Sequence, residues 1–149
     1  MSAFGISIFV DKTYEDIDAS EYDALAIPGG FEEFGVYEDA YDERFLNLIR
    51  EFDSAHKFIA SICVGALPIG ASGVINGRKA TTYHLGDGRR QKQLAEFGAD
   101  VIPDQSVVID QNIITSFCPE TAPGVALCLL EMLVGKDRAQ IVSKSMGLI

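Results

Sequence analysis

A cysteine lies where a short apolar run gives way to small residues. Residues 57–62 (KFIASI) have the composition of a buried strand, and residues 64–71 are small and apolar enough to form a closely packed helix. Cys63 stands at the junction, which predicts a strand, a sharp turn and a helix with the thiol at the turn. Free N–H groups at a helix start favour the thiolate, so Cys63 is the candidate nucleophile. A buried core cysteine is the alternative interpretation.

A second loop is predicted to meet this turn. Residues 24–27 form a short apolar strand that stops at Pro28-Gly29-Gly30. In an open α/β sheet, the loops after parallel strands emerge at the carboxyl edge, where ligands bind. Backbone N–H groups of Gly30 or Phe31, together with that of Val64, then form a candidate oxyanion hole. The alternative is an ordinary turn that ends a strand.

The remaining elements are those that would position these loops. Residues 42–52 show apolar side chains at helical spacing, and a hairpin is predicted around residues 110–111. Thr121 is a predicted N-cap of a helix that stops at Gly135, and a last helix covers residues 137–145. Short strands at residues 6–10 and 24–27 complete an alternating pattern, which predicts an α/β fold with a mostly parallel sheet.

Composition limits the classes of function. The chain has 149 residues, 48% of them hydrophobic, which predicts a single domain over residues 1–149. A net charge of −10 argues against nucleic acid and anionic membranes as partners. The three cysteines are widely spaced, so we expect neither disulfides nor a metal site. No run approaches the length of a membrane span, and we expect a cytoplasmic protein.

Three segments carry a family resemblance. YDALAIPGG, FIASICVGALPIGASGVINGRKATTYH and IITSFCPETAPGVALCLLEMLVGK resemble, in that order, consecutive segments of the ThiJ/PfpI family, which includes the DJ-one-like proteins and is related to class I glutamine amidotransferases. The resemblance implies a flavodoxin-like, three-layer α/β sandwich that lacks the family's N-terminal unit. It also implies that Cys63 holds the reactive position, with Gly29 and Gly30 on the oxyanion side.

The resemblance implies further site residues. The segment Thr82-Tyr83-His84 falls where some members carry a histidine, so Tyr83 or His84 is a candidate proton carrier; a surface histidine is the alternative. The loop that contains Cys118 and Glu120 corresponds to one that lines the family pocket. Glu120 is equally explained as a first-turn carboxylate favoured by the helix dipole. Glu32 and Glu33 are secondary candidates.

The chain departs from the family at two places. Relatives begin with a strand and helix whose early glutamate contacts the elbow cysteine, and the sequence lacks this unit. We therefore expect a homodimer, or a second polypeptide that supplies the unit. Peptidase members carry a histidine directly after the cysteine, whereas this chain has Val64, which disfavours peptidase activity.

The leading hypothesis is a cysteine-dependent enzyme that needs no cofactor and acts on a small electrophile, of the glyoxalase, deglycase or hydratase kind. Two alternatives stay open. One is a redox-sensing or chaperone-like protein in which Cys63 is an oxidisable thiol. The other is a non-catalytic family member.

Overall fold

A four-stranded sheet organises the molecule, for which a computed structural model describes residues 5–148. The strand order is β1-β2-β6-β5, in which β1, β2 and β6 run parallel and β5 is antiparallel to β6. Strands β3 and β4 form a separate parallel pair. The strands are β1 (Ala24–Ile27), β2 (Phe58–Ser61), β3 (Lys79–Ala80), β4 (Asp100–Val101), β5 (Val107–Asp110) and β6 (Ile113–Ser116).

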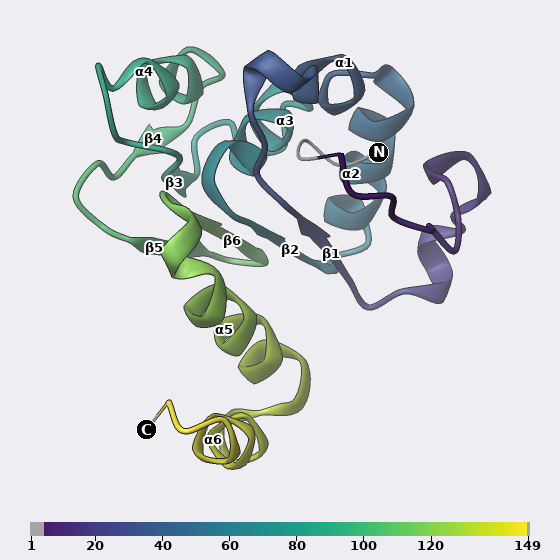
Figure 1. Ribbon diagram of the computed structural model, residues 1–149, viewed down its shortest axis with the longest axis vertical. Coiled ribbons are helices and arrows are strands. Elements are labelled where there is room, and N and C mark those ends of the chain that lie inside the picture. The colour runs from purple at the N-terminus through teal and green to yellow at the C-terminus, as the bar shows by residue number, and fades with distance from the viewer. Residues whose placement is uncertain (1–4, 149) are drawn as a thin grey trace.

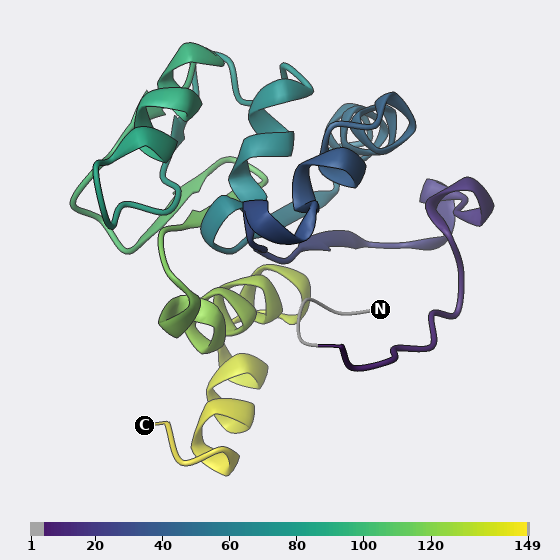
Figure 2. The same ribbon diagram turned by 45° about the horizontal axis from the view of Figure 1, so that its top comes forward.

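Helices cover both faces of the main sheet. Figure 2 shows α5 on one face and the group α1 to α3 on the other, which is the predicted three-layer α/β arrangement. Figure 1 shows α6 beyond the end of α5, away from the sheet. The helices are α1 (Val36–Ala40), α2 (Glu43–Ser54), α3 (Ala66–Ala71), α4 (Arg89–Glu96), α5 (Ala122–Val134) and α6 (Lys136–Ser145).

Strand β2 separates two apolar cores because successive side chains of a strand point to opposite faces. Ile59 packs in the larger core, which also contains Ile49 and Phe52 of α2. Its neighbour Ala60 packs in the smaller core with Val125 of α5. Both faces of β2 are therefore buried, which explains why its sequence is continuously apolar rather than alternating.

Helix α2 follows the predicted amphipathic pattern. The Asp42 carboxylate accepts a hydrogen bond from the backbone N–H of Arg44 at 2.9 Å, as an N-cap residue does. Leu46, Ile49 and Phe52 are buried one helical turn apart. The prediction of a helix packed on the sheet is confirmed.

The predicted strand at residues 6–10 is wrong. These residues form no strand, and Phe9 is 99% exposed. An apolar run becomes a strand only where a neighbour can satisfy its backbone groups. Within residues 5–148 the edge strand β1 pairs only with β2, and the 6–10 segment does not add to it.

The helices within residues 5–148 can be compared with the dimensions of a bilayer. No helix in this range combines the required length with sufficient apolar character.

Candidate functional site

Cys63 occupies a strained turn at the carboxyl end of β2. Its φ angle is +57°, in the left-handed region that non-glycine residues rarely adopt. The 3-10 turn Cys63–Gly65 follows directly, closed by a 3.0 Å hydrogen bond from the Gly65 N–H to the Ile62 carbonyl, and α3 continues from it. This is the local geometry of a nucleophile elbow, as the sequence predicts.

The glycine turn after β1 lies directly against the elbow. A Cβ atom on Gly29 would stand 2.8 Å from the Cys63 Cβ atom and 3.4 Å from Sγ. A Cβ atom on Gly65 would stand 2.7 Å from the Ile27 carbonyl oxygen and 2.8 Å from that of Pro28. Only glycines permit this approach, so the structure brings together the two loops that the sequence singles out.

The electrostatics of Cys63 differ from the sequence-based expectation of a favoured thiolate. Only 8% of Cys63 is exposed, and this burial raises the pKa of its thiol above the ordinary cysteine value. A hydrogen bond from the Val64 N–H and the positive charge of Arg90 act in the opposite direction, and the charge of Glu120 adds to the rise.

His84 is paired with the second thiol. Its Nδ1 atom lies 3.3 Å from Sγ of Cys118, and its ring contacts Phe117 with a centroid distance of 4.0 Å. Cys118 is buried, and burial raises its pKa, with the charge of Glu120 as the next contribution. The hydrogen-bonding thiol partner of His84 is therefore Cys118, which is neither the candidate role beside Cys63 nor the alternative of a surface histidine that the sequence offered.

Two threonines fasten the cysteine-bearing loops. Thr82 Oγ1 donates to the Cys63 carbonyl at 2.8 Å, which ties the Thr82-Tyr83-His84 segment to the elbow. Thr121 Oγ1 donates to the Cys118 carbonyl at 2.6 Å and lies 2.7 Å from Ser116 Oγ. Thr121 is the N-cap residue of α5, as predicted, although its hydroxyl makes no capping hydrogen bond.

The other predicted site residues take different positions around the elbow. Tyr83 is half-buried and packs against the larger core, whereas Phe31 is 49% exposed. Gly30 lies against Val36 at the start of α1. Glu120 is exposed in the first turn after Cys118, where a carboxylate is favoured by the helix dipole. Its charge also raises the pKa of both Cys63 and Cys118.

Glu32, a secondary candidate from the sequence, belongs to a cluster whose other members the sequence did not indicate. Glu32 Oε2 accepts hydrogen bonds from Arg90 at 2.6 Å and from Arg89 at 2.9 Å. The Arg90 guanidinium lies over the ring of Tyr37, 4.8 Å from its centroid. Because 58 residues separate Glu32 from Arg90 in the chain, no local pattern predicts the pair; only the acidic loop after the glycines gave a signal.

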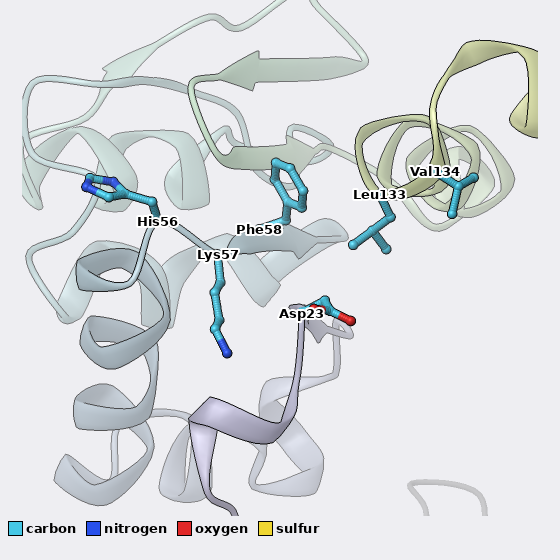
Figure 3. Close-up of a pocket in the computed structure, with 6 residues that line it drawn as sticks. All are labelled: Asp23, His56, Lys57, Phe58, Leu133 and Val134. Atoms are coloured by element: carbon cyan, nitrogen blue, oxygen red, sulfur yellow. The ribbon is translucent and has the colours of Figure 1, made fainter.

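A surface pocket of about 490 Å³ lies at the opposite end of the strands (Figure 3). Asp23 precedes β1 and Phe58 begins β2, so this pocket is at the amino edge of the sheet, away from Cys63. No group of three or more metal-ligating side chains stands close enough to hold an ion within residues 5–148. The pocket lining is Asp23, His56, Lys57, Phe58, Leu133 and Val134.

Comparison with known proteins gives related enzymes and related folds. The chain is 33% identical over 144 residues to an isonitrile hydratase of Pseudomonas putida, covering 95% of this chain and 58% of that protein. It is 32% identical over 149 residues to a glutathione-independent glyoxalase of Schizosaccharomyces pombe, with 96% and 74% coverage. Some relatives are much longer, and the chain spans little more than half of the isonitrile hydratase.

A solved structure and a family model each match most of the chain. The crystal structure of Drosophila melanogaster DJ-1beta superposes with a TM-score of 0.86 at 29% identity, covering 99% of this chain and 75% of that one. The model of the DJ-1/PfpI family matches residues 1–132, which include the glycine turn, the elbow and both cysteine-bearing loops. With this match over most of its length, the chain belongs to the DJ-1/PfpI family.

Proposed function

We propose that the chain is a cysteine-dependent enzyme that acts on a small electrophilic substrate, with Cys63 as the nucleophile. The observation that carries the proposal is the left-handed backbone of Cys63 at a turn packed against Gly29. Strain of this kind persists only where the surrounding structure enforces it, and it is concentrated at functional sites. The relatives named as an isonitrile hydratase, a glyoxalase and a deglycase support the same class of chemistry.

The first chemical step follows from the arrangement around Cys63. The thiol loses its proton to solvent water, and the sulfur then forms a bond to the electrophilic carbon of the substrate. The π electrons of the attacked double bond move to its oxygen or nitrogen, which becomes negatively charged. Backbone N–H groups of Gly30 and Val64 are the proposed donors for that charge. With a 2-oxoaldehyde such as methylglyoxal, a proton transfer between the two oxygen-bearing carbons turns the adduct into a thioester, and attack by water then breaks the carbon–sulfur bond, which releases a 2-hydroxy acid and returns the thiol.

Proton transfer during turnover is proposed to involve the loop that carries His84. Its imidazole contacts Cys118, and Thr82 ties the same loop to the Cys63 carbonyl. Glu120 follows Cys118 at the carboxyl edge of the sheet, and its charge raises the pKa of both Cys63 and Cys118. Cys118 and Glu120 thus form the proposed substrate-facing side opposite the glycine turn, with Tyr83 and His84 as the proposed proton carriers.

The burial of Cys63 favours this proposal over redox sensing. Sensor cysteines have a lowered pKa and are open to solvent. Cys63 has a raised pKa and is 8% exposed, which limits its unassisted reaction with peroxide. A bound electrophile that reaches the sulfur through the loops does not need a permanent thiolate. Peptidase activity remains disfavoured because Val64 follows the cysteine.

Substitution of each cysteine tests the proposal. Cys63→Ser is expected to lower turnover of methylglyoxal by about 100-fold or more, since a serine hydroxyl is a far weaker nucleophile without an adjacent base. Cys128→Ser, on α5 away from the elbow, is the matched control and is expected to retain turnover. Undiminished turnover in Cys63→Ser contradicts the proposal. Thermal unfolding of both variants checks that they fold.

We further propose that this is a cytoplasmic protein that associates through its exposed apolar surfaces, as a homodimer or with a second polypeptide. Ile8, Phe9 and Val10 expose most of their surface beside the edge of the sheet, and Ile141 of α6 is 65% exposed. Light scattering of the purified chain decides between the two: a dimer supports self-association, and a monomer rules it out.

A further inference from the structure

Tyr37 holds a buried hydroxyl that has no partner. Its Oη atom is buried, and it has no hydrogen-bond partner among residues 5–148. Buried polar groups of native proteins are almost always paired because a lost hydrogen bond to water is otherwise not replaced. A phenylalanine would fill the same space without this cost. The hydroxyl therefore needs an explanation beyond packing.

The ring of Tyr37 is held from both sides. It stacks on Tyr41 with a centroid distance of 5.4 Å and an interplanar angle of 11°. The Arg90 guanidinium covers it at 4.8 Å, and Glu32 fixes that guanidinium with a 2.6 Å hydrogen bond. These contacts hold the side chain in place, so the position of the hydroxyl oxygen is set by the surrounding side chains.

The glycine turn links Tyr37 to Cys63, because Gly29 lies against Cys63 and Gly30 lies against Val36, the residue that precedes Tyr37. Tyr37 lies at the start of α1, directly after the glycine turn and its acidic loop, and packs against the core cluster that includes Cys63 and Val64. Burial raises the pKa of Tyr37, and the charge of Cys63 adds to this rise. The hydroxyl thus keeps its proton at neutral pH and can act as a donor.

We propose that Tyr37 is a catalytic hydrogen-bond donor whose hydroxyl binds an oxygen atom of the substrate attached to Cys63. This inference rests on the proposed function and adds a specific residue to it. When the sulfur adds to a carbonyl carbon, the carbonyl oxygen gains negative charge, and a donor fixed in a buried site stabilises that charge strongly. The substrate oxygen supplies the partner that the hydroxyl lacks in the unliganded chain. The ligand class is a small carbonyl compound.

Tyr37→Phe and Tyr41→Phe form a matched pair for the test. The Tyr41 hydroxyl accepts a hydrogen bond from Gln93 Nε2 at 3.0 Å, so its hydroxyl is already satisfied within the fold. We expect Tyr37→Phe to lower kcat/KM for methylglyoxal by about 10- to 100-fold, the value of a hydrogen bond to a charged group. Its melting temperature should stay the same or rise. Tyr41→Phe should show the reverse: a lower melting temperature with turnover retained.

The rate of Cys63 alkylation by iodoacetamide separates a role in substrate binding from a structural one. Alkylation creates no oxyanion, so Tyr37→Phe should alkylate at close to the wild-type rate. Cys63-dependent turnover that Tyr37→Phe fully retains overturns the role of Tyr37 and leaves the proposed function intact. Lost turnover accompanied by a lower melting temperature and altered alkylation also overturns it. Wild-type turnover that does not depend on Cys63 overturns both proposals.

Discussion

The two buried cysteines near the carboxyl edge of the sheet differ in what surrounds them. Cys63 has a strained backbone, glycines pressed against it and a main-chain N–H as its nearest donor. Cys118 has an extended backbone and an imidazole 3.3 Å from its sulfur. The residue with the usual activating partner is thus not the one at the elbow.

The fold can therefore orient a thiol for reaction through the backbone around it, without a base beside the sulfur. At Cys63 the strained backbone and close packing fix the direction of the sulfur. At Cys118 the neighbouring His84 can hold a proton between its imidazole and the sulfur. We expect this geometry to decide which of the two thiols reacts with the substrate. Three sets of variants test the difference between the two cysteines.

The largest effect is expected at Gly65. In Gly65→Ala the new methyl group would meet the carbonyl oxygens of Ile27 and Pro28, which belong to the backbone and cannot move aside cheaply. We expect a loss of about 3 kcal/mol in the free energy of unfolding. Gly124→Ala is the control, because a Cβ atom there has nothing within 4 Å; it should raise stability by about 0.5–1 kcal/mol. Urea titration measures both, and equal effects would break the argument that the elbow needs close approach.

A smaller effect is expected at Thr82 and Thr121, which each hydrogen-bond the carbonyl of one of the two cysteines. Thr82→Val removes the hydrogen bond to the buried Cys63 carbonyl, and Thr121→Val removes the one to the Cys118 carbonyl. Each should cost about 1–3 kcal/mol in the free energy of unfolding, since a buried polar group is left unpaired. Thr82→Val should reduce turnover more than Thr121→Val, because it loosens the elbow that carries the nucleophile. A turnover loss confined to Thr121→Val would reverse the roles of the two loops.

The smallest effect is expected at Glu120, whose charge influences both Cys63 and Cys118. Glu120 raises the pKa of both thiols, so Glu120→Gln should lower both values and increase the thiolate fraction below those pKa values. Alkylation of Cys63 and of Cys118 by iodoacetamide at neutral pH should then be about 2- to 5-fold faster at low salt. Glu33→Gln, in the loop after the glycines, is a control with the same charge change. Mass spectrometry of the peptides gives each rate; slower alkylation in Glu120→Gln would contradict the assigned sign.

Local sequence patterns predict much of the fold. The glycine turn, the elbow at Cys63 and the amphipathic helix α2 depend on neighbours in the chain, and each is found where the pattern places it. The segment at residues 6–10 is different, because whether an apolar run becomes a strand depends on the neighbouring strand available to it.

The candidate site is less visible in the sequence. The contact of His84 with Cys118 depends on the relative position of two loops that are 34 residues apart. The raised pKa of Cys63 depends on burial by distant segments, which outweighs the local effect of the helix start. Tyr37 gave no signal, since an unpaired hydroxyl is visible only when every neighbour has been placed.

The central claim, that the Cys63 sulfur carries the reaction, is tested most directly by titrating it. The wild-type chain is alkylated progressively with iodoacetamide, and turnover of methylglyoxal is plotted against the alkylated fraction of each cysteine. The account predicts that the remaining turnover falls in direct proportion to unmodified Cys63 and reaches zero when that residue is fully alkylated. Turnover that persists on chains fully alkylated at Cys63, or that follows Cys118 instead, would contradict it.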